Sequence, residues 1–398
     1  MSIDIKNFLS ESAKHMKKSA IRELLAVANK PEIISFGGGF PNPETFPVEE
    51  LKGIVQDLLV EKPEVMLQYG TTGGSIPLRT QLKKKYERDG IQCELDNIII
   101  TTASQQAIDL ITKTFIDPGD TILCGLPTYL GALQSFNAYR ANLVGTKRIE
   151  DSEEIIEKLI AEGKKPKFIY AIPDFQNPSG ETMNLEQRKK LINLAQKYNI
   201  YVIEDSPYKD IRFEGTSYPT MFSLDPERVI LLGTFSKTFA PGFRLGWVLA
   251  SLDVVDRINT AKQTTDLCTS IFNQELAARY MEEGYFDKNL KKTVQLYRKK
   301  RDLMVKYLGE FMPEGVSWTH PEGGLFLFVT LPENLNSTEL FKIAIKENVA
   351  FVIGEVFFCD GSGQNTLRLN FSYASDENIK EGVRRLAVSI KKLMEIKK

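Results

Sequence analysis

The sequence predicts an α/β fold built on a mostly parallel sheet, followed by a smaller α+β region. Between residues 97 and 250, short runs of apolar and β-branched residues alternate with stretches of helical periodicity. From residue 315 onward the pattern changes to several short strands with helices beside them. The length of 398 residues exceeds what one simple core requires, so we expect two lobes.

The N-terminal part of the chain predicts helices separated by one irregular loop. Residues 1–30 predict an amphipathic helix, because "SAIRELLAVAN" has its apolar residues at helical spacing. Residues 31–47 contain three consecutive glycines and four prolines, which predict a fixed irregular loop. Helices are expected again at 48–62 and in the segment that ends at Gly90.

The middle of the chain predicts the strands of the main sheet. Runs that are apolar throughout are typical of strands buried on both faces, as in parallel sheets. The functional loops of such sheets lie at the carboxyl ends of the strands. The predicted strands are residues 97–101, 120–127, 167–173, 200–206, 228–235 and 244–250, and the helices among them are 104–116, 128–141 and 184–199.

The C-terminal part predicts a long helix and the smaller lobe. The helix covers about Asn289 to Phe311. We expect residues 46–289 to form the large domain, and residues 1–45 with 290–398 to form the small one, which the N-terminal helix joins. The small lobe is predicted to have strands at 315–320, 323–331, 349–354 and 366–372, and helices at 337–348 and at the C-terminus.

The composition disfavours several classes of function. Lys and Arg number 51 and Asp and Glu 52, a net charge of −1 that gives no support to nucleic-acid or membrane-surface binding. No stretch approaches about 18 apolar residues and the N-terminus lacks a signal peptide's apolar core, so a cytoplasmic protein is expected. With four cysteines in no CxxC pair and only two histidines, neither a metal site nor a disulfide framework is expected.

The segment "GTFSKTFAPGFRLGW" carries the first candidate chemistry. Lys237 lies just past the end of a predicted strand and has few charged neighbours in the sequence. Such surroundings lower the pKa of an amine, and a neutral amine can form a Schiff base. Thr234, Ser236 and Arg244 add two hydroxyls and a planar cationic fork, a set that suits a phosphate.

Other polar residues also follow predicted strands. Ser104 and Gln105 begin a helix that could bind an anion, although a serine there is often only a cap. Asp205 closes an apolar strand, where a carboxylate is costly unless it meets a cation such as a protonated pyridine nitrogen. Tyr208 and Asn177 could reach the same crevice, and turn or cap chemistry is the alternative for Asp205 and Asn177.

Four segments together resemble the class I/II aminotransferases of fold type I, which use pyridoxal 5′-phosphate. These are "TASQQAIDL", "QNPSG", "DSPY" and "GTFSK…PGFRLGW", and their order matches the family over nearly the whole chain. The resemblance implies a mostly parallel seven-stranded sheet in a large domain, a smaller α+β domain, pyridoxal 5′-phosphate as cofactor and a homodimer with a shared active site.

The resemblance also implies a role for each matching residue. Lys237 would be the Schiff-base lysine and the catalyst of the proton shift, and Asp205 would pair with the pyridine nitrogen. Tyr208 and Asn177 would hydrogen-bond the phenolic oxygen of the ring, and Arg368 would clamp the substrate α-carboxylate. The phosphate and the ring would be held by Ser104, Gln105, Thr234, Ser236 and Arg244, by Tyr129 stacked on the ring, and by Tyr69 from the partner subunit.

Within the family, "SFGGGFPNPETFP" and "LQYGTTGG" resemble most the 2-aminoadipate and kynurenine/aminoadipate aminotransferases. This implies that Gly39 lets the substrate approach and that Arg22 meets an acidic substrate side chain, with a surface ion pair as the alternative for Arg22. The expected reaction moves the amino group of an L-amino acid to a 2-oxo acid such as 2-oxoglutarate by a ping-pong mechanism. Candidate donors are 2-aminoadipate, glutamate, and aromatic or branched-chain amino acids.

The same motifs are compatible with other functions. A β-lyase of the same fold, or a non-catalytic sensing domain like those of bacterial transcription regulators, stays open. A nicotinamide-dependent Rossmann enzyme is disfavoured because no GxGxxG follows the first predicted strand.

Overall fold

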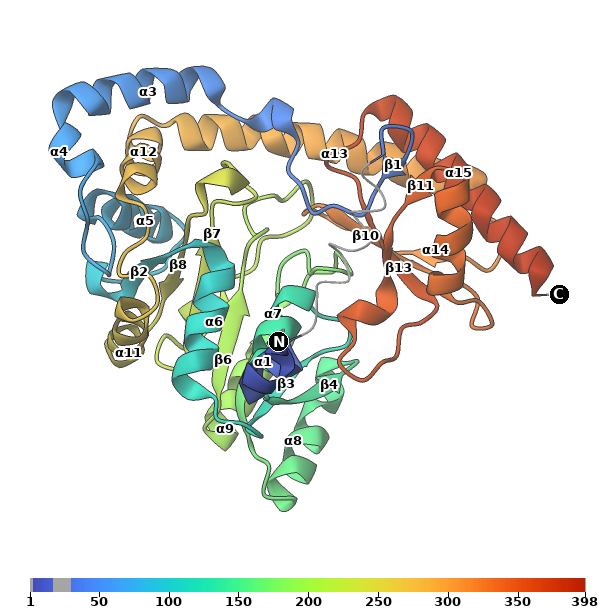
Figure 1. Cartoon of the computed structure of the whole chain (residues 1–398), viewed down its shortest axis with the longest axis horizontal. Helices are drawn as coiled ribbons and strands as arrows, with labels where there is room; N and C mark the ends of the chain where they lie inside the picture. Colours follow the sequence, from blue (N-terminus) through green and yellow to red (C-terminus); the bar gives the residue numbers. More distant parts are fainter. Residues whose placement is uncertain (1–2, 17–29, 398) are drawn as a thin grey trace.

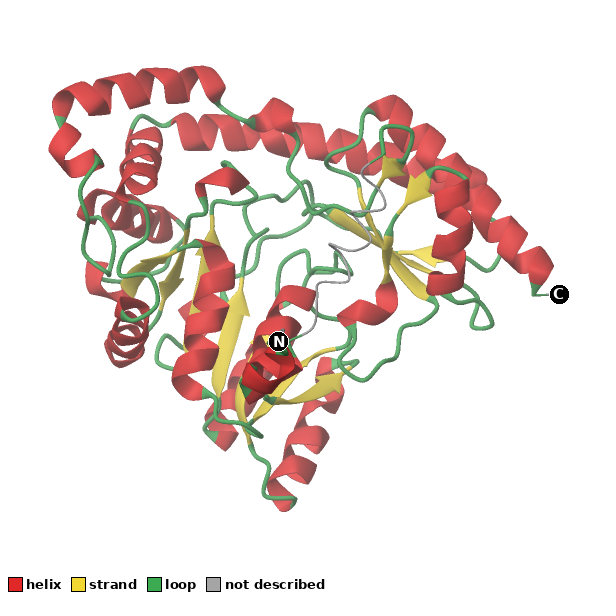
Figure 2. Ribbon diagram, in the orientation of Figure 1, coloured by secondary structure: helices red, strands yellow, loops and turns green. Residues whose placement is uncertain are grey.

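A computed structural model describes residues 3–16 and 30–397 of the chain. Helices surround a large sheet on one side of the molecule and a smaller sheet on the other. The long helix α13 (Tyr285–Phe311) extends from the part with the large sheet to the part with the smaller one (Figure 1). Figure 2 shows the same arrangement by element type, with the strands of the large sheet pointing toward the loops between the two sheets. The predicted fold class is therefore confirmed.

The large sheet has seven strands in the order β2-β8-β7-β6-β5-β3-β4. Strand β8 runs antiparallel to its neighbours β2 and β7, and the other pairs are parallel. The strands are β2 (Ile98–Thr101), β3 (Thr121–Gly125), β4 (Asn142–Thr146), β5 (Pro166–Ala171), β6 (Tyr201–Asp205), β7 (Val229–Thr234) and β8 (Gly246–Leu249).

Six of these strands match the predicted segments, and β4 is the one that the apolar pattern does not reveal. Strand β4 lies at the edge of the sheet and is only half-buried along its length. Its sequence "NLVGT" mixes polar and small residues because an edge strand is not buried on both sides.

Helices cover both faces of the large sheet. Along β2, the side chains of Ile98 and Ile100 join one apolar cluster and that of Ile99 joins the other, as the alternation of a strand requires. One face is covered by α3 (Val48–Glu61), α5 (Ile76–Arg88), α8 (Ser152–Ala161), α9 (Leu185–Tyr198) and α12 (Ile271–Glu282), and the other by α6 (Ala103–Phe115), α7 (Leu130–Ala138) and α11 (Leu252–Gln263).

The smaller sheet has four antiparallel strands in the order β12-β13-β10-β9. A separate apolar cluster packs this sheet against α13 and the C-terminal helices. The division of the chain into domains at residues 45 and 289 stays a prediction. The elements are β9 (Ser317–Trp318), β10 (Phe326–Thr330), α14 (Ser337–Lys346), β12 (Val352–Ile353), β13 (Thr366–Asn370) and α15 (Asp376–Ile396).

Two expectations about the smaller lobe need correction. The segment 349–354 is not one strand: β11 (Val349–Ala350) pairs with β1 (Ile34–Ser35), whereas β12 pairs with β13. In the sequence, the buried residue Phe351 separates the two short strands. The long helix begins at Tyr285 instead of about Asn289, after Gly284 in a left-handed conformation.

The N-terminal residues do not form the single helix that was expected. The 3-10 helix η1 (Ile5–Phe8) and the helix α1 (Glu11–His15) are separated by extended backbone at Leu9 and Ser10, and Ser10 caps α1. Helix α1 lies against α7 of the larger part. The segment "SAIRELLAVAN", which contains Arg22, lies entirely outside the described residues.

None of the helices formed by residues 3–16 and 30–397 is long and apolar enough to cross a membrane.

Candidate active site

The predicted site residues gather where the strands of the large sheet end. Asp205 is the last residue of β6 and Thr234 the last of β7, while Asn177 and Lys237 lie in the loops that follow β5 and β7. Because these strands are parallel neighbours, their carboxyl ends lie at one edge of the sheet. Across from this edge, Arg368 lies in β13 of the smaller sheet.

The amine of Lys237 has a lowered pKa. Its Nζ donates a 2.8 Å hydrogen bond to the backbone carbonyl of Gly39, in the glycine-rich loop. Removal from water, together with the positive charges of Arg368 and Arg244, lowers the pKa of Lys237 to about 8. An uncharged amine is therefore accessible close to neutral pH, as the sequence predicts for this lysine.

Asp205 has a buried carboxyl with one oxygen in use. Its Oδ2 accepts a 2.7 Å hydrogen bond from the hydroxyl of Tyr170. Its Oδ1 has no hydrogen-bond partner among the described residues. Burial raises the pKa of Asp205 to about 6, and the bond from Tyr170 opposes that rise. A buried, unpartnered carboxylate oxygen is costly, so the site favours a cationic or hydrogen-bonding group there.

Arg368 is buried, with only 2% of its surface exposed. Its guanidinium donates 2.8 Å hydrogen bonds to Asn177 Oδ1 and to the carbonyl of Gly37, and lies 4.1 Å above the centroid of the Phe326 ring. Burial lowers its pKa to about 10. The described groups that hydrogen-bond this guanidinium include no carboxylate, and its Nε has no partner among the described residues. A buried cation without a counter-ion suits an anionic ligand.

Tyr208 lies beside this arginine. Its buried ring meets Phe326 edge-on, with ring centroids 5.7 Å apart. Burial raises the pKa of its hydroxyl, which therefore stays protonated, and the side chain of Asn177 is a hydrogen-bonding neighbour. The structure thus brings Tyr208, Asn177 and Arg368 together, as the sequence predicts.

A second group lies at the end of β7. The hydroxyls of Thr234 and Ser236 are 3.0 Å apart, and Arg244 Nη1 is 3.5 Å from Ser236 Oγ. Arg244 adopts a left-handed backbone conformation, with φ of 52°, which is uncommon for a side-chain-bearing residue and typical of functional sites.

The start of α6 packs against this group. A Cβ on Gly246 would lie 2.6 Å from the carbonyl carbon of Ala103 and 2.7 Å from the backbone nitrogen of Ser104. Only a glycine permits this approach. Ala103 also has positive φ, at 61°. The backbone at Ser104 is thereby held beside the strand that follows Arg244.

Gln105 is placed differently from the other candidates. Its Oε1 accepts a 3.1 Å bond from the hydroxyl of Tyr129, and its Nε2 donates to Ser135 Oγ at 2.9 Å and to the carbonyl of Gly131 at 3.0 Å. The side chain therefore ties α6 to the first two turns of α7 and orients Tyr129. Its predicted contact with a phosphate stays a prediction.

Two of the candidates cannot be joined to the site within this chain. Tyr69 follows the short helix α4 (Pro63–Met66) and is 79% exposed, and its hydroxyl bonds to no described residue. Its contact with a partner subunit stays a prediction. Arg22 lies outside the described residues. Gly39, by contrast, faces the site: a Cβ there would lie 3.4 Å from the Phe326 ring and 3.9 Å from Lys237 Nζ.

The sequence did not reveal three groups that contact the site residues. These are the Tyr170 hydroxyl on Asp205, the Gly37 carbonyl on Arg368 and the Phe326 ring beneath it. A single hydroxyl within the apolar run "FIYAI" was the one available signal for Tyr170. A backbone carbonyl and an apolar ring carry no such signal.

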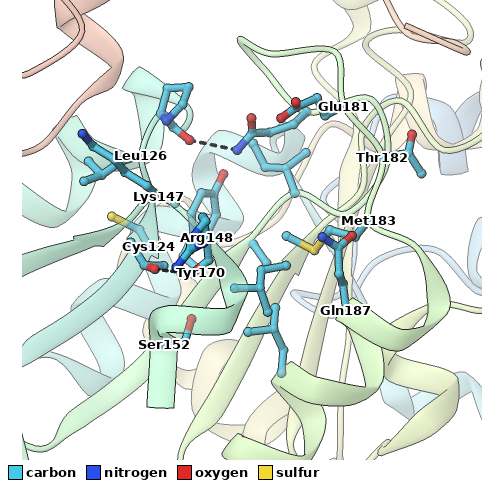
Figure 3. A pocket seen from close by; sticks show the side chains of 18 of the residues that line it. Cys124, Leu126, Lys147, Arg148, Ser152, Tyr170, Glu181, Thr182, Met183 and Gln187 are labelled. Atoms are coloured by element: carbon cyan, nitrogen blue, oxygen red, sulfur yellow. Dashed lines mark hydrogen bonds between the residues drawn. The ribbon is translucent and has the colours of Figure 1, made fainter. Parts of the chain in front are cut away.

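A cavity of about 540 Å³ opens beside this edge of the sheet. Its lining includes Cys124, Arg148, Tyr170 and Gln187, and does not include Lys237 (Figure 3). The Sγ atoms of Cys124 and Cys359 are 4.0 Å apart, and the four cysteines are free thiols. Among residues 3–16 and 30–397, no group of His, Cys, Asp and Glu side chains could hold a metal ion.

The seven-stranded sheet and the residues at its edge define a transferase of fold type I. Residues 32–386 match the family described as aminotransferase class I and II, and the chain belongs to this family. An aromatic-amino-acid aminotransferase of Thermococcus litoralis is 45% identical over 401 residues, covering 99% of this chain and 96% of that protein. The resemblance inferred from the motifs is confirmed.

Solved structures are similar over the same length. A multiple-substrate aminotransferase from Thermococcus profundus has a TM-score of 0.94 and 44% identity, covering 99% of this chain and 100% of that one. The α-aminoadipate aminotransferase of Thermus thermophilus, in complex with N-(5′-phosphopyridoxyl)-L-leucine, has a TM-score of 0.90 and 36% identity, with 99% and 100% covered. The chain is an aminotransferase, as predicted.

Proposed function

We propose that the chain uses pyridoxal 5′-phosphate to move the amino group of an L-amino acid to a 2-oxo acid such as 2-oxoglutarate, in two alternating half-reactions. One observation carries the proposal: a lysine of lowered pKa and a buried aspartate oxygen without a described partner lie at the same sheet edge. Groups whose pKa values are perturbed in this way cluster at functional sites.

The residues present fit the cofactor's chemistry. The amine of Lys237 suits the aldehyde carbon, and the free Oδ1 of Asp205 suits a protonated ring nitrogen. Tyr208 and Asn177 supply hydrogen bonds for the phenolic oxygen. The hydroxyls of Thr234 and Ser236, the guanidinium of Arg244 and the backbone at Ser104 would hold the phosphate.

When bound, pyridoxal phosphate supplies an electron-withdrawing ring that acidifies the α-hydrogen of the amino acid. Lys237 would be the base that holds this proton on Nζ and gives it up again, since its pKa of about 8 suits an amine to both tasks near neutral pH. Asp205 would favour the protonated ring nitrogen, and Tyr129, whose hydroxyl bonds Gln105, would cover the face of the ring.

Arg368 binds the α-carboxylate of the substrate. Its planar fork matches a carboxylate, and its buried charge has no described counter-ion. Gly39 leaves room next to Lys237 for the substrate. The relatives named above act on aromatic, multiple or aminoadipate substrates, which supports a broad donor range for this chain. Arg22 is the residue proposed to select acidic donors.

The active enzyme is proposed to be a homodimer with Tyr69 reaching the phosphate of the partner subunit's site. A large aromatic side chain that is 79% exposed in the single chain supports this, because such residues are favoured at interfaces.

The test is a cofactor and donor assay on the purified chain. The visible absorbance of bound pyridoxal phosphate should be lost in Lys237→Ala. Amino acids added one at a time should bleach the band, and 2-oxoglutarate should restore it, which together identify the donors and the two half-reactions. Release of pyruvate and ammonia without need of an acceptor would favour a β-lyase. No cofactor band in the wild type would contradict the proposal and favour a non-catalytic domain.

A further inference from the structure

Tyr170 lies on the strand beside the one that ends at Asp205 and is not among the predicted site residues. It is in β5, is 1% exposed, and its ring packs edge-on against Phe136 with centroids 5.4 Å apart. In the sheet it pairs with Ile203, two residues before Asp205 on the neighbouring strand. A ring packed in this way has little freedom, so the position of its hydroxyl is determined by the core.

The Tyr170 hydroxyl makes the single hydrogen bond that the described residues offer to the Asp205 carboxyl. The bond is short, at 2.7 Å, and engages Oδ2 only. A carboxyl group has one soft torsion, and engaging one oxygen therefore determines where the other points. The direction of Oδ1 is therefore determined by Tyr170, whose own ring is held by packing in the apolar layer between β5 and α7.

We infer that Tyr170 is a positioning residue, which holds the Asp205 carboxyl so that its free oxygen meets the ring nitrogen of the cofactor. The inference rests on the proposed function and goes beyond it, because it assigns the alignment of Asp205 to a side chain outside the predicted site. A hydrogen bond from a neutral hydroxyl also favours the ionised carboxylate, the form that pairs with a protonated nitrogen.

A purely structural tyrosine would behave differently. If Tyr170 serves only to fill the core, loss of its hydroxyl would affect every ligand of the site equally. If it acts through Asp205, the loss should affect only ligands that have a ring nitrogen. The chemistry of the ligand can therefore separate the two roles.

The experiment compares two ligands on the full-length chain freed of cofactor. Pyridoxamine 5′-phosphate has the ring nitrogen and forms no covalent bond to Lys237, and its analogue carries a C–H in place of that nitrogen. Dissociation constants are measured by calorimetry for the wild type and for Tyr170→Phe, which keeps the ring that packs on Phe136. We expect Tyr170→Phe to raise the dissociation constant of pyridoxamine phosphate roughly tenfold or more, as for loss of a hydrogen bond to a charged group. The dissociation constant of the analogue should not change.

Two further variants keep the result interpretable. Tyr280→Phe is the matched control, because the buried Tyr280 hydroxyl has no hydrogen-bond partner among the described residues. It should leave both dissociation constants unchanged. In an Asp205→Asn background, Tyr170→Phe should add little to the loss of pyridoxamine phosphate binding, since the two residues act on one atom. Thermal unfolding of each variant establishes that it is folded before titration.

The outcomes are distinct. If Tyr170→Phe weakens the binding of both ligands equally, or weakens the binding of neither, the inference is overturned and the proposed function stays intact. The inference would also be overturned if Tyr170→Phe weakened pyridoxamine phosphate binding as much in the Asp205→Asn background as in the wild type. If the wild type binds neither ligand, the proposed function fails and the inference fails with it.

Discussion

The Nζ atom of Lys237 donates a 2.8 Å hydrogen bond to the carbonyl oxygen of Gly39, a residue 198 positions earlier in the chain. A neutral carbonyl stabilises an ammonium group less than a carboxylate does, so the bond holds the amine in place without restoring its ordinary pKa. The partner of this lysine therefore leaves it free for chemistry, in contrast to Lys262, which is paired with Asp266.

Lys237→Ala should abolish amino-group transfer, because no described residue replaces the amine. We expect the rate of each half-reaction to fall by about 10²–10⁴ or more, the range for loss of a positioned general base. Lys237→Arg should be equally inactive, because a guanidinium keeps the positive charge but does not release a proton. Stopped-flow absorbance of the half-reactions provides the measurement. Substantial turnover in either variant would exclude Lys237 as the base.

Asp205→Asn should stabilise the cofactor-free chain near neutral pH. The folded pKa of Asp205 is raised from 3.8 to about 6, so the folded state holds this proton more tightly than the unfolded state. Stability therefore falls as pH rises from 3.8 to about 6, and the cost persists above that range. Asparagine removes this cost, which is at most about 3 kcal/mol for such a shift.

Urea unfolding of the two cofactor-free proteins at a series of pH values measures the effect. The difference in the free energy of unfolding should be largest at neutral pH and should vanish below pH 3.8, where Asp205 is protonated in both states. A difference that does not depend on pH would show that burial of the charge is not its cause. The same variant should bind pyridoxamine phosphate more weakly.

Arg368→Lys should slow the turnover of substrates that have an α-carboxylate. Lysine retains a charge but loses the fork that now bonds Asn177 Oδ1 and the Gly37 carbonyl. We expect kcat/KM for amino acids to fall by roughly 10–10², as for loss of a hydrogen bond to a charged group. Primary amines that lack the carboxylate should react at their former slow rate. The exposed Arg148, paired with Asp151, offers Arg148→Lys as a neutral control.

Tyr69→Ala and Lys237→Ala should complement each other in mixed dimers. If Tyr69 serves the partner subunit, a hybrid dimer has one site with both residues intact and one site with neither. Each variant alone should be inactive or strongly impaired, and an unfolded-and-refolded mixture should recover up to about a quarter of wild-type activity. If Tyr69 serves its own subunit, no hybrid site is complete and mixing should restore nothing.

Gly246→Ala should damage the packing between β8 and the start of α6. A Cβ there would lie 2.6 Å from the backbone carbonyl carbon of Ala103, which cannot move independently of the helix. We expect a loss of about 1–3 kcal/mol in the free energy of unfolding, with weaker retention of the cofactor phosphate. Gly242→Ala is the control, because a Cβ at Gly242 would meet nothing within 4 Å. Equal effects of the two changes would contradict this explanation.

Much of the fold could be predicted because buried strands have a strong local signature. The run "VILLGT" of β7 is apolar and buried along its whole length, and the sequence identifies it directly. The apolar pattern does not predict strand β4, because an edge strand needs no such run. The same pattern predicts one strand at 349–354, because it carries no information on which sheet each half joins.

The candidate site divides in the same way. The sequence by itself determined which side chains are candidates for the chemistry. Lys237 and Asp205 are residue types of specific chemistry at the ends of predicted strands, and the family resemblance adds Arg368. Only the tertiary structure decided their partners. The Gly39 carbonyl on Lys237, the Tyr170 hydroxyl on Asp205 and the Phe326 ring under Arg368 come from distant segments. Such contacts depend on how strands pair and lobes pack, and local periodicity carries no information about groups that meet only after the chain has folded.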